Sequence, residues 1–509
     1  MTNLPVNPQN ERNMLQKKWQ QTCISLIPLI VLVALLALNI SIFGSDSILG
    51  ASQVVLLIAA GICVWLGVWL FKTPWKVFED AIGNNIGEVT SAIIILFMIG
   101  AISGTWTISG IIPTLIYYGI QIISPRFFLV TACVICAIVS VMIGSSWTTI
   151  ATVGLALMGI GKAEGFSDAI TAGAIISGAY FGDKISPLSD TTVLASSVSG
   201  TPLFEHIRYM LYTTVPSIVI TLVIFTILGF THDGAAPQIN IYTDTLQAHF
   251  NITPWLLTVP VITGVMIVRK LPALVVLGLS VMLAAVFAGI FQGDIVRTIG
   301  SQAALTHDVT RTLPGWQLML AGSIETIYNS VSIDTGVAQV NELLTSRGMT
   351  GMLNTVYLVF CAMCFGACMR ASGMIGHLAR PLRKITRRRT ALVGTTLCTG
   401  AAMNALVCEQ YLSIILTSNV YRDIYEKAGY ENRLLSRTIE DSATVTSPLI
   451  PWSSCGMTQA TILNTPTLTY LPYCFFNIIS PLMSLLIAGL GYKIFRREVP
   501  EEESVSASK

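Results

Sequence analysis

The chain has 509 residues, of which 53% are hydrophobic and 11% are charged, with a formal net charge of +2. An average globular domain carries roughly 25% charged residues. No basic segment is interleaved with aromatic residues, and the sequence has no phosphate loop, dinucleotide fingerprint or histidine-rich metal cluster. The composition therefore excludes a nucleic-acid-binding protein, an ATPase and a redox enzyme, and we expect neither enzymatic activity nor a cofactor.

Uncharged runs recur along the whole length of the chain. A helix needs about 20 apolar residues to cross the hydrocarbon of a bilayer, and most of these runs are that long. A soluble protein could bury one or two such runs but not all of them. The sequence therefore predicts an all-α, polytopic membrane protein embedded in a lipid bilayer. The runs are 24–43, 52–71, 89–125, 127–161, 209–231, 250–268, 271–293, 348–369, 390–408 and 442–492.

The run at 24–43 follows three basic residues, Arg12, Lys17 and Lys18, which is also how a secretory signal begins. A cleaved signal has a shorter apolar stretch and a cleavage site of small residues. This run is long enough to span the bilayer, and many spans follow it. We interpret it as a retained first transmembrane helix.

Short strings from the first half of the sequence recur in the second half at a nearly constant spacing. Because the order of the strings is also kept, chance does not explain them, and we predict an internal repeat. The matches are Ser186-Pro187-Leu188 with Ser447-Pro448-Leu449, Tyr209 and Tyr212 with Tyr470 and Tyr473, and Ser109-Gly110 with Ser372-Gly373.

The distribution of Lys and Arg predicts how the two repeats are oriented, because positive charge stays on the cytoplasmic side. The basic N-terminus, Arg269 and the arginine cluster at 380–389 are predicted to be inside, and the connection at 231–253, which has no Lys or Arg, to be outside. The stretch around Arg387 matches 124–126, which we predict to be external. The two halves are therefore predicted to be inverted relative to each other, as in many secondary carriers.

These signals divide the chain into five parts. We predict that each repeat holds about five spans, one re-entrant hairpin and one broken helix. The parts are a cytoplasmic tail at 1–23, a first transmembrane repeat at 24–232, an external connection at 233–253, a second transmembrane repeat at 254–495 and a cytoplasmic tail at 496–509.

Two runs are too long for a single span. A helix over 127–161 would be about 52 Å long at 1.5 Å per residue, against a hydrocarbon core of about 30 Å. Gly144-Ser145-Ser146 lies at its middle, and we predict a re-entrant hairpin there. The run at 390–421 has basic residues on both sides and is predicted to form the second hairpin. The run at 89–125 is interpreted as one broken or strongly tilted span; a second hairpin there would change the topology.

The segment 180–192 combines charge with helix-breaking residues. Pro187 removes a backbone donor, so a break is expected beside Asp183 and Asp190. Charge within a membrane is costly and is functional by default. Carboxylate, carbonyl and hydroxyl oxygens suit a hard cation, here sodium. Lys184 is expected to pair with one aspartate; the alternative is that Asp183 and Lys184 close a cytoplasmic turn.

The segment 440–456 contains the same ingredients in the second half. Asp441 is a candidate ligand together with Asp183 and Asp190, whereas Glu440 fits a solvated helix start near Arg437. The two hairpin tips add polar groups to the predicted site. Glu409 lies among uncharged residues and is costly unless it is protonated or paired. The remaining candidates are Ser145, Ser146, Thr148, Ser186, Asn404 and Ser447.

Arg370 lies at the end of an apolar run, and the sequence assigns it no single role. Three interpretations stay open. It could extend to the cytoplasmic side, pair with Glu409, or bind an anionic group of a substrate.

Four strings resemble the NhaC-type sodium/proton antiporter family: WTISGIIPTLIYYG from Trp106, GSSWTTIATVG from Gly144, AGAIISGAYFGDKISPLSDTT from Ala172 and LSRTIEDSATVTSPLIPW from Leu435. The resemblance covers about 75–490. It implies a bacterial plasma-membrane carrier that exchanges sodium for protons, in a superfamily with paired hairpins and broken helices. It also implies that some members move organic acids, including malate and lactate, or amino acids. Glu409, where an aspartate is expected, and Arg370 depart from the family pattern.

The leading hypothesis is therefore a secondary antiporter that works by alternating access, with sodium and protons competing for the same carboxylates. The acids expected to carry transport are Asp183, Asp190, Glu409 and Asp441. The alternative is a sodium- or proton-coupled exchanger of a small carboxylate or an amino acid. A channel or a membrane scaffold is a third, weaker alternative. We predict cytoplasmic termini, and we leave a homodimer open.

Overall fold

The computed structural model describes residues 8–43, 50–231, 236–269, 271–306, 313–346, 348–382 and 388–496. Within these residues the chain is helical, with two isolated β-bridges in place of any sheet. The predicted all-α fold is confirmed. Basic residues at 383–387, and the outer parts of both predicted tails at 1–7 and 497–509, lie outside the described residues.

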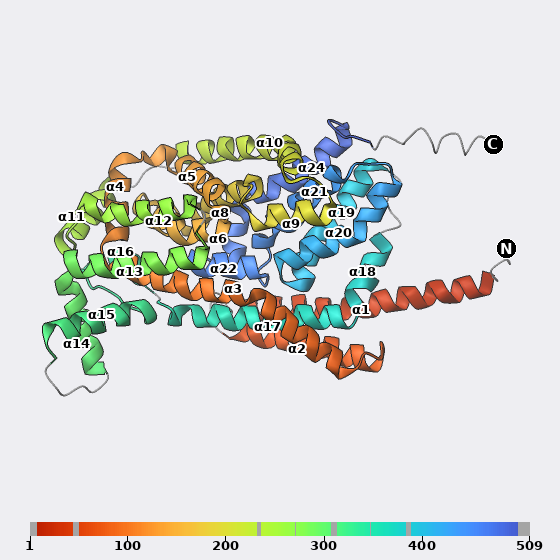
Figure 1. Cartoon of the computed structure of the whole chain (residues 1–509), viewed down its shortest axis with the longest axis horizontal. Coiled ribbons are helices and arrows are strands. Elements are labelled where there is room, and N and C mark those ends of the chain that lie inside the picture. The colour runs from red at the N-terminus through yellow and green to blue at the C-terminus, as the bar shows by residue number, and fades with distance from the viewer. Residues whose placement is uncertain are drawn as a thin grey trace.

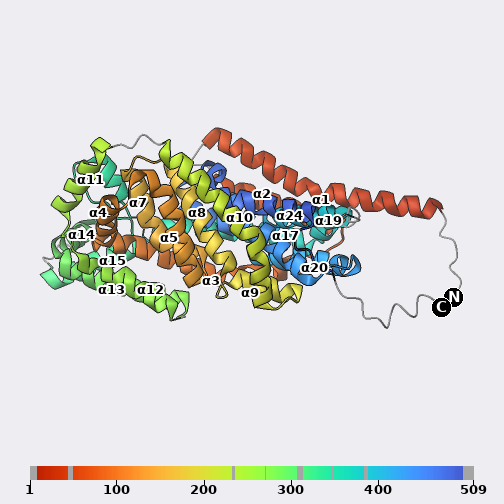
Figure 2. The same ribbon diagram turned by 90° about the horizontal axis from the view of Figure 1, so that it is seen from above.

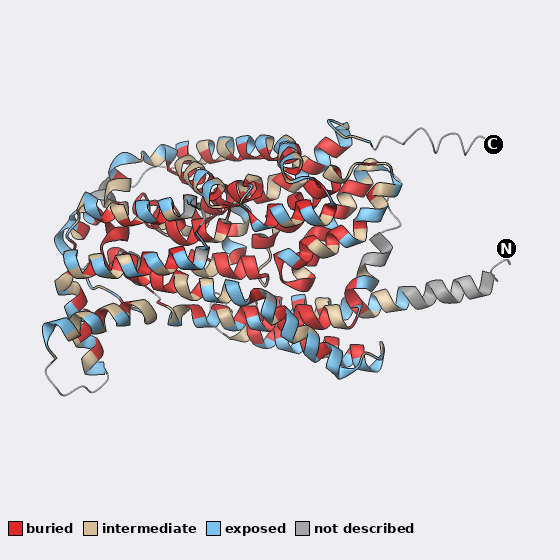
Figure 3. Cartoon of the chain, in the orientation of Figure 1, coloured by how far each residue is buried: buried red, intermediate tan, exposed pale blue. Residues whose placement is uncertain are grey.

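Eight described helices are long and apolar enough to cross a membrane, and a ninth span is obtained if one bent helix pair is counted. Their outer faces are apolar. On the helix Leu203–Phe230, for example, Val219, Val223 and Ile227 follow one another at helical spacing and are all more than half exposed. Exposed residues cover the outer helices while buried residues fill the centre (Figure 3). The protein is therefore a multi-pass membrane protein.

The described helices lie mainly along the long axis of the molecule (Figure 1 and Figure 2). Helices α4, α11 and α14 lie at one end and α19 and α20 toward the other. In the first half the outer helices are α1 (Pro8–Phe43), α2 (Ala51–Trp69), α3 (Trp75–Ile108), α4 (Ile111–Ile122) and α10 (Leu203–Phe230). Between the halves lies α11 (Ala236–His249), a helix where the sequence indicated only a connection.

The second half begins with two helical hairpins and a short helix. They are α12 (Thr258–Val268) with α13 (Ala273–Phe291), α14 (Gly293–Thr306) with α15 (Gly315–Tyr328), and α16 (Ala338–Leu343). The chain continues with α17 (Leu353–Ala371) and α18 (Met374–Leu382), and ends with α23 (Thr467–Tyr470) and α24 (Phe475–Leu490).

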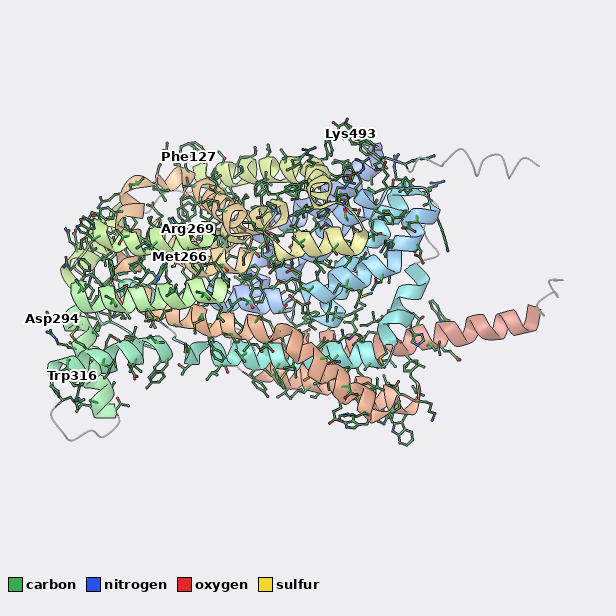
Figure 4. The ribbon with its side chains drawn as sticks, in the orientation of Figure 1. Phe127, Met266, Arg269, Asp294, Trp316 and Lys493 are labelled. Atoms are coloured by element: carbon green, nitrogen blue, oxygen red, sulfur yellow. The ribbon has the colours of Figure 1, made fainter. Side chains whose placement is uncertain are left out.

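Four labelled residues mark different positions along the long axis of the molecule. Asp294 and Trp316 lie at one end, and Lys493 lies toward the opposite end (Figure 4). Arg269 lies nearer the middle, away from Lys493. The two basic residues, which the sequence assigned to one side of the membrane, therefore differ in position along the long axis.

The run at 89–125, predicted as one broken or tilted span, forms two elements: Val89–Ile108 is long enough to cross a membrane by itself, and the short apolar helix α4 follows it. Helix α3 ends at Ile108, Gly110 adopts a left-handed φ of 83°, and α4 begins at Ile111. The matching Gly373 in the second half has a φ of 73° and separates α17 from α18. Glycine takes this conformation without the penalty of a Cβ atom, which explains why both breaks fall there.

Both runs form helical hairpins, but the first arm of each, Pro125–Ile143 and Arg389–Val407, is long enough to cross a membrane by itself, so their re-entrant course stays a prediction. The first consists of α5 (Phe128–Ile143), a short α6 (Ser146–Thr149), a π-helical turn and α7 (Leu155–Ala163). Its arms are antiparallel, because Gly161 near the end of α7 lies against Phe128 at the start of α5. The second consists of α19 (Arg389–Val407) and α20 (Gln410–Lys427), where Thr399 bonds to Tyr421 across the arms at 2.8 Å.

Both halves also contain a broken helix. In the first, α8 (Asp168–Ile185) stops before Pro187 and α9 (Asp190–Ser199) resumes. In the second, α21 (Asn432–Ile439) runs into a π-helical turn (Glu440–Thr444), a 3₁₀ turn (Ser447–Leu449) and then α22 (Ser454–Ile462). Each break leaves backbone carbonyls and amides without their helical hydrogen-bond partners, next to the cavity described below.

Close packing against α5 fixes the position of α8. A Cβ atom on Gly178 would collide with the backbone carbonyl of Cys133, and one on Gly182 with that of Ala137. Small residues allow two helix backbones to approach in this way. The broken end of α8, which carries Asp183, is thereby held next to the tip of the first hairpin.

Candidate ion-binding site

Both hairpin tips and both helix breaks meet at one cavity of about 450 Å³. Its other walls come from α3, α17 and the turn between α12 and α13, and they are apolar except for Ser91 on α3. The polar lining consists of Ser145, Ser146, Trp147 and Thr148 from the first tip, Asp183, Ser189, Asp190 and Thr191 from the first break, Glu409, Gln410 and Tyr411 from the second tip, and Ser454 and Cys455 from the second break.

The first tip is shaped by Gly144 and Ser145. Gly144 has a left-handed φ of 72°, and a Cβ atom there would lie 2.6 Å from the backbone of Leu188 in the first break. The Ser145 hydroxyl then accepts a hydrogen bond from the backbone N–H of Thr148 at 3.2 Å and caps α6. The tip therefore rests directly on the break, and its hydroxyl groups face the cavity.

The second tip repeats this arrangement with different residues. Cys408 takes the left-handed position, with a φ of 59°, and its carbonyl accepts a hydrogen bond from the Ser454 N–H at 2.8 Å. The Glu409 carboxylate caps α20 by accepting from the Leu412 N–H at 2.8 Å. An acid is thus placed at a helix N-terminus, where its negative charge is stabilised.

Asp183 is the carboxylate with the most hydroxyl contacts in the cavity. It is 5% exposed. One of its oxygens accepts from the Ser146 hydroxyl at 2.7 Å, and the other accepts from the Ser189 hydroxyl at 2.6 Å. Thr192 donates to the backbone carbonyl of Lys184, one of those that the break frees, at 3.0 Å. A carboxylate beside several hydroxyl oxygens is a donor set that suits a hard monovalent cation.

Asp190 begins α9 and lines the same cavity, but its environment differs from that of Asp183. Its side chain is exposed, whereas the neighbouring Ser189 and Thr191 are buried and bond to each other at 2.9 Å. The cavity therefore contains three carboxylates, those of Asp183, Asp190 and Glu409, and no Lys, Arg or His among its described lining residues. This charge pattern favours a cation over an anion.

Lys184 does not pair with an aspartate of its own segment. Its ammonium bonds to the carboxylate of Asp441 in the opposite half, and both side chains are fully buried. The same Asp441 oxygen accepts from Ser480 at 2.9 Å and from Thr213 at 3.2 Å. The charge of Asp441 is thus matched by Lys184, and the structure does not place Asp441 in the cavity with Asp183 and Asp190.

Glu440 is not at a solvated helix start. Its side chain is fully buried, like that of Arg437 one helical turn earlier. Within the described part of the chain, neither Glu440 oxygen accepts a hydrogen bond. Arg437 lies against the ring of Tyr209 at 4.7 Å, and its Nε is 3.9 Å from an Asp441 oxygen. These groups lie behind the cavity wall, not in it.

Three neutral candidates hold the backbone near the cavity but do not line it. Ser186 donates to the Val141 carbonyl at 2.8 Å. Asn404 donates to the Ala443 carbonyl at 2.7 Å. Ser447 donates to the Gln410 side chain at 3.0 Å, across the second tip and break. Their hydrogen bonds join each hairpin to a broken helix, so their role in this structure is to position the site.

Arg370 lies apart from the cavity. Its guanidinium bonds to the side-chain oxygen of Asn85 on α3. It lines a separate surface depression together with Asp80 and Asn84. The structure therefore does not bring Arg370 to Glu409, which caps its own helix.

The described residues contain no group of three or more His, Cys, Asp or Glu side chains arranged as metal ligands. The cavity instead mixes carboxylates with hydroxyls and helix ends. Such a loose oxygen-rich site can bind an ion and release it again, as transport requires.

A sequence profile of the Na⁺/H⁺ antiporter family matches residues 178–492. The match includes both helix breaks and the second hairpin. The chain belongs to the Na⁺/H⁺ antiporter family. The family predicted from the four strings is thus confirmed.

Curated relatives are similar to this chain over most of its length. The malate-2H⁺/Na⁺-lactate antiporter of Bacillus subtilis is 34% identical, over 86% of this chain and 89% of the relative. The Na⁺/H⁺ antiporter NhaC of Alkalihalophilus pseudofirmus is 35% identical, over 84% and 88% respectively. The arginine/ornithine antiporter ArcD of Halobacterium salinarum is 33% identical, over 95% and 96%.

Sequence reasoning missed several residues of this Na⁺/H⁺ antiporter family member. Ser189 and Gln410 lie beside predicted residues, and the signal that could have found them is their polar side chains next to Asp190 and Glu409. Arg437, Thr213 and Ser480 gave no signal of their own, because only the folded chain brings them to Asp441.

Proposed function

We propose that this protein exchanges sodium for protons across the bacterial plasma membrane by alternating access, with sodium bound in the cavity at Asp183. The observation that carries the proposal is the position of Asp183 within a helix break. Both of its oxygens accept hydroxyl hydrogen bonds, one from the hairpin tip and one from the break. A cation that replaces these two hydrogen bonds can be bound by the Asp183 carboxylate and by the two hydroxyl oxygens of Ser146 and Ser189 together.

The physical setting supports a transport site. An irregular backbone at membrane depth is stable only where protein or a water-filled cavity satisfies its polar groups. Three acids in such a place are costly unless a cation or a proton accompanies them. Sodium and protons are the ions that the family description names.

The inverted arrangement of the halves is part of the proposal. It is supported by the equivalent elements in each half, since each hairpin tip rests on a helix break: Gly144 on Leu188, and Cys408 on Ser454. The start of α1 and the end of α24 both lie toward one end of the molecule, which agrees with cytoplasmic termini (Figure 1). The predicted homodimer is tested by light scattering of the detergent-solubilised protein.

The exchange is tested in everted membrane vesicles by adding sodium and following the internal pH. Asp183→Asn keeps the size of the side chain and removes its charge, and we expect the sodium-driven pH change to fall by about tenfold or more. Asp294→Asn is the matched control, because the Asp294 side chain is fully exposed and distant from the cavity. Wild-type exchange by Asp183→Asn would remove Asp183 from the site.

A second candidate function is exchange of an organic solute. The cavity volume of about 450 Å³ falls within the range of small-molecule sites, about 300–1,000 Å³, and is far larger than a bare cation needs. Two of the relatives are named for malate and lactate or for arginine and ornithine. Proteoliposomes offered sodium, lithium, malate, lactate and amino acids in parallel decide between the two functions. Ion flux that requires an organic solute would favour the second, whereas sodium-driven proton flux with no organic solute present would favour the first.

A further inference from the structure

Four charged side chains form a buried group behind the cavity wall, which we call the charge cluster: Lys184, Arg437, Glu440 and Asp441. Each belongs to a residue with no exposed surface. The proposed sodium site uses none of them. Burying four charges in a membrane protein is expensive, so the cluster calls for a function.

Asp441 is the fixed member of the cluster. One of its oxygens accepts hydrogen bonds from Lys184, Ser480 and Thr213. Its other oxygen is 3.9 Å from the Arg437 Nε. Two cations and two hydroxyl groups therefore surround the side chain of Asp441.

Glu440 has the opposite environment. In the described residues neither a Glu440 oxygen nor a guanidinium nitrogen of Arg437 has a hydrogen-bond partner of good geometry, although the Thr444 hydroxyl lies close enough to act on Glu440. The two side chains are three residues apart on one helical segment, where residues at this spacing are neighbours. Glu440 also begins a π-helical turn, a distortion frequent at functional sites. The unused Arg437 donors and the unused Glu440 acceptors therefore lie about one helical turn apart, and no described ion pair joins them.

The groups around Glu440 are few. Lys184, Asp183 and Asp441 act on it electrostatically. Of the other helices packed against its turn, α24 carries no charged residue, and α19 carries only Arg389, which donates to carbonyls at the end of α24. The remaining titratable neighbours are Asp190 at the start of α9, the buried Tyr421 and Tyr425 of α20, and His206 and Tyr209 of α10.

The charge balance makes the protonation state of Glu440 reversible. An ionised Glu440 gives the charge cluster two positive and two negative charges, but it must share Lys184 and Arg437 with Asp441. A protonated Glu440 removes one carboxylate and leaves one excess positive charge. Neither protonation state is strongly favoured. The ionised state buries an additional carboxylate, and the protonated state buries one excess positive charge.

Resting on the proposed exchange, we propose that Glu440 is the proton site of the antiporter, separate from the sodium site at Asp183. The geometry links the two sites through α8. Asp183 faces the cavity, and the next residue, Lys184, is bonded to Asp441 in the charge cluster. Sodium and protons then bind at different carboxyl groups. Binding of one weakens binding of the other by way of the last turn of α8.

The coupled step can be followed atom by atom. When the Glu440 carboxyl loses its proton to water, its oxygens accept hydrogen bonds from Arg437 or Lys184. Lys184 is then drawn from Asp441, and the last turn of α8 shifts with it. That shift alters the position of Asp183 between Ser146 and Ser189, and so the affinity of the cavity for sodium. Protonation of Glu440 reverses the change.

The test uses the full-length purified protein in proteoliposomes and separates sodium movement from proton movement. Glu440→Gln is nearly isosteric and cannot lose a proton. We expect it to retain ²²Na⁺/Na⁺ exchange within about threefold, and to lose sodium-driven proton flux by about tenfold or more. We also expect the sodium concentration at half-maximal exchange to stop changing between about pH 6 and 9.

Glu164→Gln is the matched control, since Glu164 is equally buried but lies near the opposite end of α8. It should keep the wild-type pH dependence. Normal proton flux in Glu440→Gln overturns the inference while leaving the proposed function intact. Absence of any sodium flux in the wild-type protein instead overturns the proposed function.

A loss of both fluxes in folded Glu440→Gln also overturns the inference, because it shows a structural role for Glu440. If that variant does not fold, Glu440→Asp keeps an ionisable group at a changed distance. A shift in the pH dependence of its sodium affinity supports the proton site. A pH dependence identical to that of the wild-type protein overturns it.

Discussion

At the scale of single residues, the buried pair of Lys184 and Asp441 is the contact that holds the two halves together most specifically. It joins α8 of the first half to the π-helical turn of the second, and both side chains are fully buried. A buried pair adds little net stability compared with apolar residues. Losing one partner is costly, however, because an uncompensated charge stays behind.

Lys184→Met tests this contact. It leaves the Asp441 carboxylate without its ammonium partner, and we expect the free energy of unfolding to fall by about 3–5 kcal/mol. Lys76→Met is the control, because the exposed Lys76 pairs with Glu79 and Asp80 at the surface. Its effect on the free energy of unfolding should be small, because solvent screens an exposed ion pair. Thermal unfolding in detergent measures both; equal effects would contradict a buried structural pair.

Glu409 offers a second test at this scale, because its capping role can be separated from its charge. Glu409→Gln keeps an oxygen that can accept from the Leu412 N–H, whereas Glu409→Ala does not. We expect Glu409→Gln to be as stable as the wild-type protein, and Glu409→Ala to be about 0.5–2 kcal/mol less stable. Sodium-driven proton flux should fall in both. Wild-type flux in Glu409→Gln would show that this carboxylate serves only as a helix cap.

The residue scale is also where sequence reasoning was weakest. Asp183, Asp190 and Glu409 could be chosen because each interrupts an apolar run, and the structure places all three at one cavity. Asp441 was chosen for the same reason but is bonded to Lys184. The spacing of residues predicts which face of its own helix a residue occupies. It does not predict which residue of the other half that face will contact.

At the scale of elements, the two hairpin tips depend on one backbone position each. Gly144 and Cys408 both adopt a left-handed conformation, and each tip packs on the helix break of its own half. These elements were predictable, because Gly-Ser and Ser-Pro strings interrupt runs that are too long for a single span. Helix α11 and the hairpin of α14 with α15 were not predicted, because their sequences are amphipathic or mixed and carry no breaking motif.

Gly144→Ala tests the contact between tip and break. The new Cβ atom would lie 2.6 Å from the backbone of Leu188, in addition to the left-handed strain of about 1–2 kcal/mol. Gly373→Ala is the matched control: its φ of 73° is the same, but nothing lies within 4 Å of the added atom. We expect Gly144→Ala to lose sodium-driven exchange by about tenfold or more, since small displacements at a site cost that much.

Gly373→Ala should reduce stability slightly and leave exchange close to wild type. The comparison is made by fluorescence-detected size exclusion for folding and by vesicle transport for exchange. Equal transport in the two variants would contradict a functional contact between the first tip and the first break.

At the scale of the whole molecule, two similar halves bring a hairpin and a broken helix each to one cavity, with a charge cluster behind it. The halves differ in their chemistry. The first tip contributes the hydroxyls of Ser145 and Ser146, whereas the second contributes Glu409 and Gln410. The proposed sodium site at Asp183 and the proposed proton site at Glu440 therefore lie at different places, and the end of α8 links them.

The most direct measurement of the central claim is equilibrium binding of ²²Na⁺ to the purified protein in detergent at fixed pH. Binding should be saturable in the wild-type protein, in Asp294→Asn and in Glu440→Gln. It should be lost in Asp183→Asn, because the cavity carboxylate with hydroxyls on both of its oxygens is then uncharged. Saturable binding of wild-type strength in Asp183→Asn would contradict the assignment of this cavity as the sodium site.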